Sequence, residues 1–196
     1  MRLWRRTALS ITAIGLALAG SASVAVAGPV ADDAQRVERE VRELLRLHPG
    51  SHRIGTTEVE LRPGLVASVP PARTGSGEIG AADTQGCRTS YVCLNEHADF
   101  RGYGIALIEC GVADLYESFM PDGRRWSDQV SSIRNAQTGG LQARFHNYSG
   151  SGTRLDPANW RLVLVLNAGH YLKNLTKDSS ADGGNANDKI DIVHVC

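Results

Sequence analysis

Short apolar runs separated by polar turns dominate the sequence from residue 87 onward. The runs are YVCLNE, YGIALIEC, SSIRNA, LQARFHN, RLVLVLN and IDIVHVC, and Gly, Asp, Asn or Ser stand between them. Many short strands between turn signals are typical of an all-β sandwich or barrel. We therefore predict an all-β domain over residues 87–196.

A different pattern precedes this domain. In residues 32–47 apolar side chains recur at helical spacing between two aspartates and the stop signal HPG, which predicts a helix. Residues 57–69 alternate apolar and polar positions on both sides of Pro63-Gly64, which predicts a β-hairpin. A helix and one hairpin bury little apolar surface alone, so residues 28–70 either pack on the main domain or act as a pro-segment. Residues 71–86 are rich in Pro, Gly, Ser, Thr and Ala, which predicts a linker.

The first 27 residues have the pattern of a signal peptide. Three arginines precede an apolar stretch that is too short to span a membrane, and small residues ending in Ala25-Val26-Ala27 follow it. We expect export by either the general or the twin-arginine route, with a secreted mature protein that begins near residue 28 and has no membrane span.

Composition excludes one class of partner. Removing the three arginines of the signal peptide leaves 18 of the 21 basic residues against 21 acidic residues, a mildly acidic balance. Nucleic-acid binding would require a basic excess or a basic cluster, and neither is present, so we expect no nucleic-acid partner. The chain gives no signal for its oligomeric state.

Four cysteines lie in the second half of the chain, at positions 87, 93, 110 and 196. An even number of cysteines in an exported protein indicates two disulfides, and three pairings are possible. We expect Cys87 with Cys93, which closes a small loop, and Cys110 with Cys196, which ties the middle of the domain to the last residue. A zinc site at Cys196 and His194 lacks the spacing of zinc ligands.

No catalytic motif is recognisable in the chain. HExxH, GxSxG and a phosphate-binding GxxxxGK[ST] are all missing, and the six histidines lack metal-ligand spacing. We therefore expect a protein that is not an enzyme and has no catalytic residues.

The predicted domain contains a weak internal repeat. YVCLNEHADFRGYGIAL (91–107) matches LQARFHNYSGSGTRL (141–155), each with a strand, a polar bend and a second strand. The loop WSDQVSSIRN (126–135) returns as NANDKIDIVHV (185–195). Two copies of one four-strand unit follow from this repeat.

These residues carry a family likeness. The bend through Phe100-x-Gly102 resembles the folded hairpin that opens a βγ-crystallin Greek key, and SDQVSSIRN resembles the loop that closes it. With four cysteines, the helix-hairpin leader and the linker, the chain is similar to the bacterial βγ-crystallin-like metalloproteinase inhibitors. The resemblance implies a double Greek-key sandwich and an extracellular metalloproteinase as partner. It does not place a reactive bond, because the inhibitor's own disulfide loop has no counterpart here; the long segment 167–187 is our predicted contact surface, although its polarity also suits a disordered bulge.

The same resemblance implies calcium, the one cofactor we predict. The family's loop pattern is two Asn/Asp residues, two of any type, Ser/Thr and then Ser. Ser127 departs from it in the first copy, and Asp191 and Ile192 depart from it in the second. Calcium binds carboxylate, hydroxyl and carbonyl oxygens, so the calcium candidates are Asp128, Ser131, Asp188 and Asp191.

A structural role for these loops is compatible with calcium binding. The resemblance implies that Ser132 hydrogen-bonds back to the bent hairpin near Gly102. Val130 and Ile133 are expected in the core, and Trp126 and Trp160 are expected to pack between the two Greek keys. The two functions that follow are metalloproteinase inhibition and, as the alternative, a calcium-binding or structural extracellular module that acts at the cell envelope or as a killer-toxin-like factor.

Overall fold

The structure is a computed structural model and describes residues 29–72, 87–108 and 110–196. The predicted signal peptide and residues 73–86 of the predicted linker lie outside the described residues. Within them, no helix is both long and apolar enough to cross a membrane.

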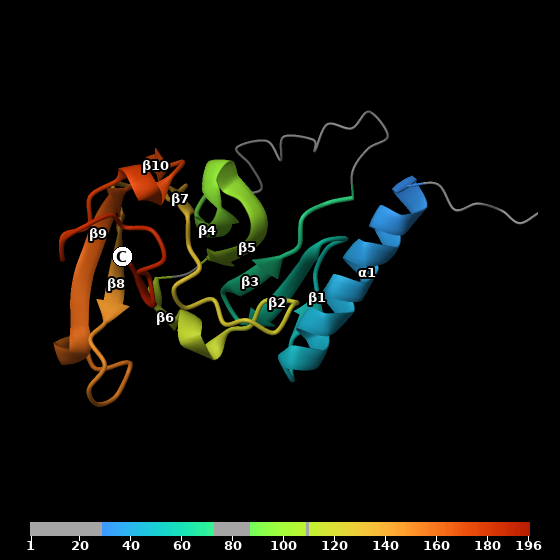
Figure 1. Cartoon of the computed structure of the whole chain (residues 1–196), viewed down its shortest axis with the longest axis horizontal. Helices are drawn as coiled ribbons and strands as arrows, with labels where there is room; N and C mark the ends of the chain where they lie inside the picture. The colour runs from blue at the N-terminus through green and yellow to red at the C-terminus, as the bar shows by residue number, and fades with distance from the viewer. Residues whose placement is uncertain (1–28, 73–86, 109) are drawn as a thin grey trace, which may run out of the picture.

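The described residues form one α-helix, eleven strands and four 3-10 turns (Figure 1). The N-terminal segment contains α1 (Pro29–Leu47), β1 (His52–Arg53), β2 (Glu58–Arg62) and β3 (Leu65–Ser68). The first four-strand unit contains β4 (Val92–His97), β5 (Arg101–Leu107), β6 (Gly111–Asp114) and β7 (Ser132–Asn135). The second contains β8 (Gln142–Tyr148), β9 (Trp160–Asn167), β10 (Tyr171–Leu172) and β11 (Ile192–Val195). The turns are η1 (Ala98–Phe100), η2 (Leu115–Glu117), η3 (Pro157–Asn159) and η4 (Leu175–Lys177).

The two units exchange their third strands. One sheet has the order β1-β2-β3-β5-β4-β7-β10 and the other has the order β6-β11-β8-β9, with antiparallel pairing throughout. Thus β6 of the first unit completes the sheet of the second, and β10 of the second completes the sheet of the first. Two interlocked Greek keys of this kind confirm the predicted all-β double Greek-key sandwich.

The N-terminal segment continues the first sheet. Strand β3 pairs with β5, with Val66 opposite Ala106 and Ser68 opposite Gly104. The predicted helix and the predicted hairpin, with its turn at residues 63–64, both form. Figure 1 shows α1 beside β1 and β2, at the end of the molecule opposite β8 and β9.

One apolar core runs through both sheets and reaches the helix. Alternation along the strands directs Leu94, Ile133, Phe145 and Val193 inward, and each of these side chains is fully buried. The core continues under β2 and β3, where helical spacing brings one face of α1 onto these strands through Val37, Val41 and Leu44. The helix therefore covers strands that the four-stranded sheet does not reach.

Both predicted disulfides are present. Cys87 is bonded to Cys93, and Cys110 is bonded to Cys196, with sequence separations of 6 and 86 residues. The second bond joins the residue before β6 to the residue after β11, and these two strands pair with each other. Because Cys196 is consumed in this bond, it is not a zinc ligand.

Candidate functional site

Two equivalent segments, residues 126–132 and 186–192, meet at the contact between the Greek keys; we call them the paired loops. The Asp128 N–H donates to the Ile190 carbonyl (3.2 Å), and the Asp188 N–H donates to the Val130 carbonyl (3.3 Å). The two bonds are equivalent, because Asp128 and Asp188, and likewise Val130 and Ile190, lie 60 residues apart in the sequence. Asp128 and Asp188 also share a left-handed backbone, with φ of 57° and 52°, a conformation in which Asp and Asn are enriched. The paired loops thus have an approximate twofold relation.

The same relation extends to the turns before the loops. The Leu115 N–H donates to the Asp191 carbonyl (2.8 Å), and the Leu175 N–H donates to the Ser131 carbonyl (2.9 Å). Asp114 caps the first of these turns as Asn174 caps the second. We therefore divide the contact between the loops and these turns into two halves. The Asp191 half is the region of Asp191 and the turn capped by Asp114, and the Ser131 half is the region of Ser131 and the turn capped by Asn174.

Ser132 has the predicted role in the fold. Its hydroxyl accepts a hydrogen bond from the Phe100 N–H (3.1 Å) and donates to the His97 carbonyl (2.7 Å), and the side chain is fully buried. These bonds hold the bend of the first hairpin, in which Gly102 has φ of +79° and a Cβ would lie 2.9 Å from Glu96 Oε2. Val130 and Ile133 are fully buried, as predicted.

In the Asp191 half, the carboxylate of Asp191 is engaged by the protein itself. It accepts hydrogen bonds from the Ser127 hydroxyl and from the Tyr148 N–H, the latter at 2.8 Å. Asp191 is buried, with 4% of its surface exposed. In the first copy the hydroxyl of Ser132 holds the hairpin, and in the second copy the carboxylate of Asp191 holds it instead. Ile192, which stands where the first copy has Ser132, therefore needs no hydroxyl.

The guanidinium of Arg154 lies in this same half. It makes a two-point ion pair with Asp114, at 2.7 Å from Nε and 3.0 Å from Nη2, and approaches Asp191 Oδ1 at 3.5 Å. The rings of Tyr116 and Tyr148 each lie 4.5 Å from its Cζ. Arg154 is thus fixed by charge, hydrogen bonds and aromatic contacts together.

Asp128 lies on the exposed side of the first loop. Loss of hydration is the main cause that raises its pKa from 3.8 to about 6. Repulsion from Asp191 and Asp188 raises this pKa further, and attraction to Arg154 lowers it. Loss of hydration also raises the pKa of Asp188. Both carboxyls therefore resist ionisation, and a bound cation would favour it.

The four calcium candidates come from both loops. Asp128 interacts electrostatically with both Asp191 and Asp188. The Asp188 carboxylate accepts a hydrogen bond from Asn187, whose Oδ1 is buried without a hydrogen-bond partner. An unpartnered oxygen beside a carboxylate fits a calcium ion, which prefers such hard ligands. Calcium in the Ser131 half would be held by Ser131, Asn187 and Asp188, whereas the Asp191 half already contains a cationic group.

Neither half is rich in metal-binding side chains. Among residues 29–72, 87–108 and 110–196, no three His, Cys, Asp or Glu side chains are placed to hold a metal ion. Any calcium site would thus depend on hydroxyl, amide and backbone oxygens as well.

Arg154 belongs to the β8–β9 loop, which we define as residues 149–156. Three consecutive carbonyls in this loop accept side-chain hydrogen bonds: Gly152 from Tyr148 Oη (2.5 Å), Thr153 from Asn159 Nδ2 (3.0 Å) and Arg154 from Trp160 Nε1 (2.7 Å). Figure 1 shows the connection between β8 and β9 projecting from one end of the molecule. The loop is thus exposed in position but fixed in conformation.

Two expectations from the sequence differ from the structure. Trp126 is buried in the core, but Trp160 lies outside it, half-buried, with its ring 5.2 Å from that of His146. Its indole N–H serves the β8–β9 loop instead. The segment 167–187 is folded, because β10 pairs with β7 and Leu175 is fully buried; as a contact surface it stays a prediction.

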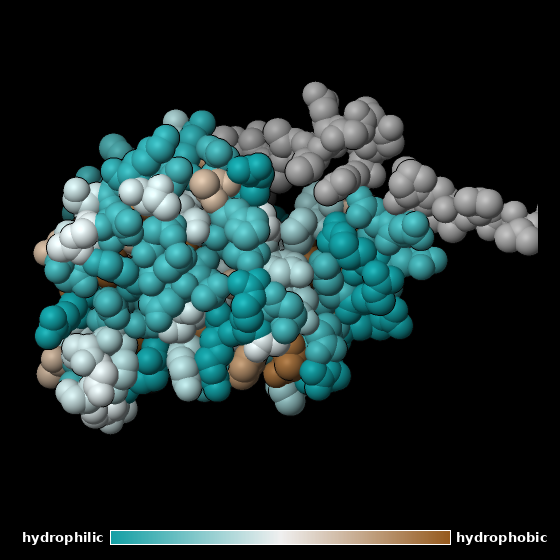
Figure 2. Space-filling model, viewed as in Figure 1, coloured by the Kyte–Doolittle hydropathy of each residue, from teal (hydrophilic) through white to brown (hydrophobic). Residues whose placement is uncertain are grey.

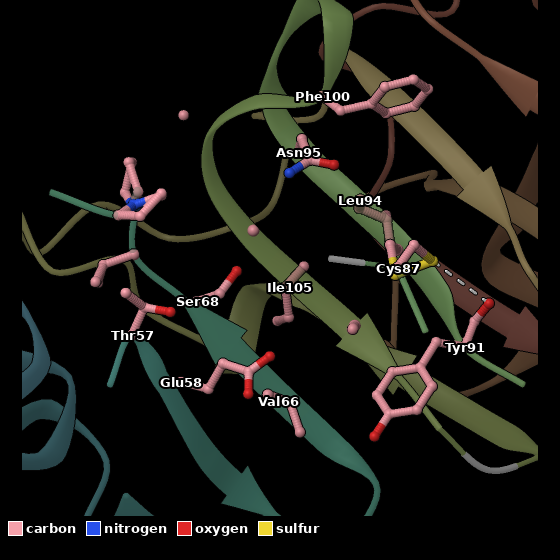
Figure 3. Close-up of a pocket in the computed structure, with 17 residues that line it drawn as sticks. Thr57, Glu58, Val66, Ser68, Cys87, Tyr91, Leu94, Asn95, Phe100 and Ile105 are labelled. Atoms are coloured by element: carbon pink, nitrogen blue, oxygen red, sulfur yellow. Dashed lines mark hydrogen bonds between the residues drawn. A yellow bond between two sulfur atoms is a disulfide. The ribbon is translucent and has the colours of Figure 1, made fainter. Parts of the chain in front are cut away.

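A groove of about 210 Å³ lies on the outer face of the first sheet (Figure 3). Gly102, Gly104, Ile105 and Ala106 of β5 line it. Ser68 and Asn95 flank Gly104 on the neighbouring strands. Neither of these two side chains has a hydrogen bond within the described residues. Tyr91 and Glu58 stand at one end of the groove in Figure 3, with Glu58 paired to Arg88.

No family model matches the chain, and no curated protein matches it. One solved structure, reported under the heading "Evolution of the eye lens beta-gamma-crystallin domain fold", matches with 19% identity over 55% of this chain and 86% of that chain, at a TM-score of 0.37.

The class is defined by the structure itself. Exchanged third strands, a serine-held hairpin bend and paired loops related by a twofold are together the arrangement of a βγ-crystallin-type fold. The chain thus has an all-β, βγ-crystallin-like fold with two disulfides and an added helix and hairpin.

Proposed function

We propose that the protein is a secreted inhibitor of an extracellular metalloproteinase and that the β8–β9 loop enters the protease cleft. The observation that carries this proposal is the immobilisation of a projecting loop by the rest of the domain. An inhibitor of this kind is effective when its contact loop is ordered before binding, because the entropy of ordering is then not lost on association. Here the side chain of Arg154 and three loop carbonyls are all fixed in the free protein.

Leu155 is the side chain that this loop offers to a partner. Its exposed fraction of 56% is the highest among the large apolar side chains that the structure describes. The residue before it, Arg154, is anchored at both its backbone and its side chain, and Asp156 after it donates its N–H to the Thr153 carbonyl (3.1 Å). An apolar side chain presented on a fixed backbone suits a protease with an apolar specificity pocket.

The rest of the surface favours recognition by such a loop. The face in Figure 2 is mostly hydrophilic, with apolar side chains in small, separate areas. The signal-like first 27 residues and the two disulfides support an extracellular site of action. The metalloproteinase class comes from the resemblance of the sequence to the bacterial inhibitors.

The test is an inhibition screen of purified residues 28–196 against secreted metalloproteinases of the thermolysin type, with a serine protease as the control. We expect stoichiometric inhibition of at least one metalloproteinase, with the β8–β9 loop uncut in the complex after brief incubation. If micromolar protein inhibits none of them, the proposed function is wrong.

A calcium-binding module is the second candidate function, and the unpartnered Asn187 Oδ1 favours it. Calorimetric titration with calcium tests it, with a double variant Asp128→Asn/Asp188→Asn as the comparison. Heat that is absent from the native protein, or unchanged in the double variant, removes the paired loops as a calcium site.

A further inference from the structure

The two halves of the paired loops have equivalent backbones but very different charges. The Asp191 half contains the carboxylates of Asp191 and Asp114, together with the guanidinium of Arg154. At the equivalent positions the Ser131 half has Ser131 and Asn174, which are uncharged. Two carboxylates therefore accompany the half that has its own cation, and their two counterparts in the other half carry no charge.

The position of the guanidinium accounts for this difference. Arg154 forms ion pairs with Asp114 and Asp191, which are both buried, with 7% and 4% of their surfaces exposed. Without Arg154, two buried carboxylates that now share one guanidinium would have no cation between them, which is strongly unfavourable unless they bind another cation. Oxygen ligands from carboxylates are the set that calcium prefers.

We propose that Arg154 takes the place of a metal ion in the Asp191 half, so that the native chain binds no calcium there and removal of the guanidinium creates a calcium site. Because Arg154 belongs to the β8–β9 loop, its ion pairs also connect that loop to the contact between the Greek keys. The hairpin of β8 and β9 is held by the Asp191 carboxylate through the Tyr148 N–H and needs no metal ion. This inference does not depend on protease inhibition.

The experiment compares the native protein with Arg154→Gln in calcium titrations by calorimetry at neutral pH, after treatment with a chelator. Arg154→Gln is expected to bind one calcium ion more than the native protein, and its unfolding temperature is expected to rise on adding calcium. The control Arg144→Gln removes an exposed arginine whose only side-chain hydrogen bond among the described residues is to Gln142, and it should titrate like the native protein.

Two further variants make the outcome decisive. Arg154→Gln/Asp191→Asn should lose the added ion, and Arg154→Lys should not gain it, because the ammonium keeps the positive charge. If Arg154→Gln is unfolded after chelation, circular dichroism during calcium addition replaces the calorimetry, and recovery of the β-sheet signal at millimolar calcium supports the proposal. An unchanged stoichiometry in a folded Arg154→Gln, or no recovery of an unfolded one, overturns it.

Discussion

Ser132 is the most informative position for testing the fold, because its structural role can be separated from any role in binding metal. The variant Ser132→Ala removes a hydroxyl that bonds both the Phe100 N–H and the His97 carbonyl. Ser132 is fully buried, so water cannot replace the hydroxyl. A buried polar group left without a partner costs about 1–3 kcal/mol, and with two such groups we expect a loss of about 3 kcal/mol in the free energy of unfolding.

The neighbouring residue supplies a matched control. Ser131 has the same side chain, but its hydroxyl makes no hydrogen bond within the described residues, so Ser131→Ala should change the stability by less than about 0.5 kcal/mol. Urea denaturation followed by tryptophan fluorescence measures both variants, with the native slope retained if the transition stays two-state. Equal losses in the two variants, or no loss in Ser132→Ala, would refute the role of Ser132 in holding the hairpin.

Three further predictions concern charge, covalent bonding and the loop. The pKa of Asp128 is raised from 3.8 to about 6 in the folded chain, so the native protein loses stability as the pH rises through this window. Asp128→Asn lacks this loss. It should be more stable than the native protein by about 1 kcal/mol above pH 7, allowing for solvent screening, and equally stable near pH 3.5. Replacing Cys110 and Cys196 by serine should cost about 4 kcal/mol, against about 2 kcal/mol for the shorter Cys87–Cys93 loop, in the chain-entropy model; comparable losses in urea denaturation would contradict it. Trp160→Phe removes the donor to the Arg154 carbonyl, so limited proteolysis within residues 149–156 should be roughly fivefold faster, and an unchanged rate would count against this bond.

Local patterns in the sequence were enough to predict the helix, the hairpin, two copies of a four-strand unit and the disulfides, whereas the Greek-key arrangement of these units came from the family resemblance. Helical spacing predicts the buried face of α1, and strict alternation predicts which side of β4 or β8 faces the core. The role of Ser132 came from the resemblance, which could place it because that role depends on one short motif and one bend.

The remaining features depend on contacts between distant segments. Pairing of β3 with β5 joins strands on either side of residues 73–86, and neither strand specifies its neighbour by its own pattern. Arg154 gave no signal as an isolated arginine, because only the folded hairpin brings it to Asp114, 40 residues earlier. A departure from the family pattern was the available clue: Asp191, where a Ser/Thr is expected, has a carboxylate that needs a partner.

The proposed function is tested most directly by Leu155→Asp in a titration against a metalloproteinase that the native protein inhibits. The control is Leu141→Asp, an exposed leucine (39%) in the connection that precedes β8, at the other end of that strand. Burying a leucine contributes about 2 kcal/mol and placing a carboxylate in an apolar pocket costs more, so the inhibition constant should rise roughly a hundredfold or more for Leu155→Asp and should change by less than about threefold for Leu141→Asp. Full inhibition by Leu155→Asp would contradict the assignment of the β8–β9 loop, and no inhibition by the native protein would contradict the function itself.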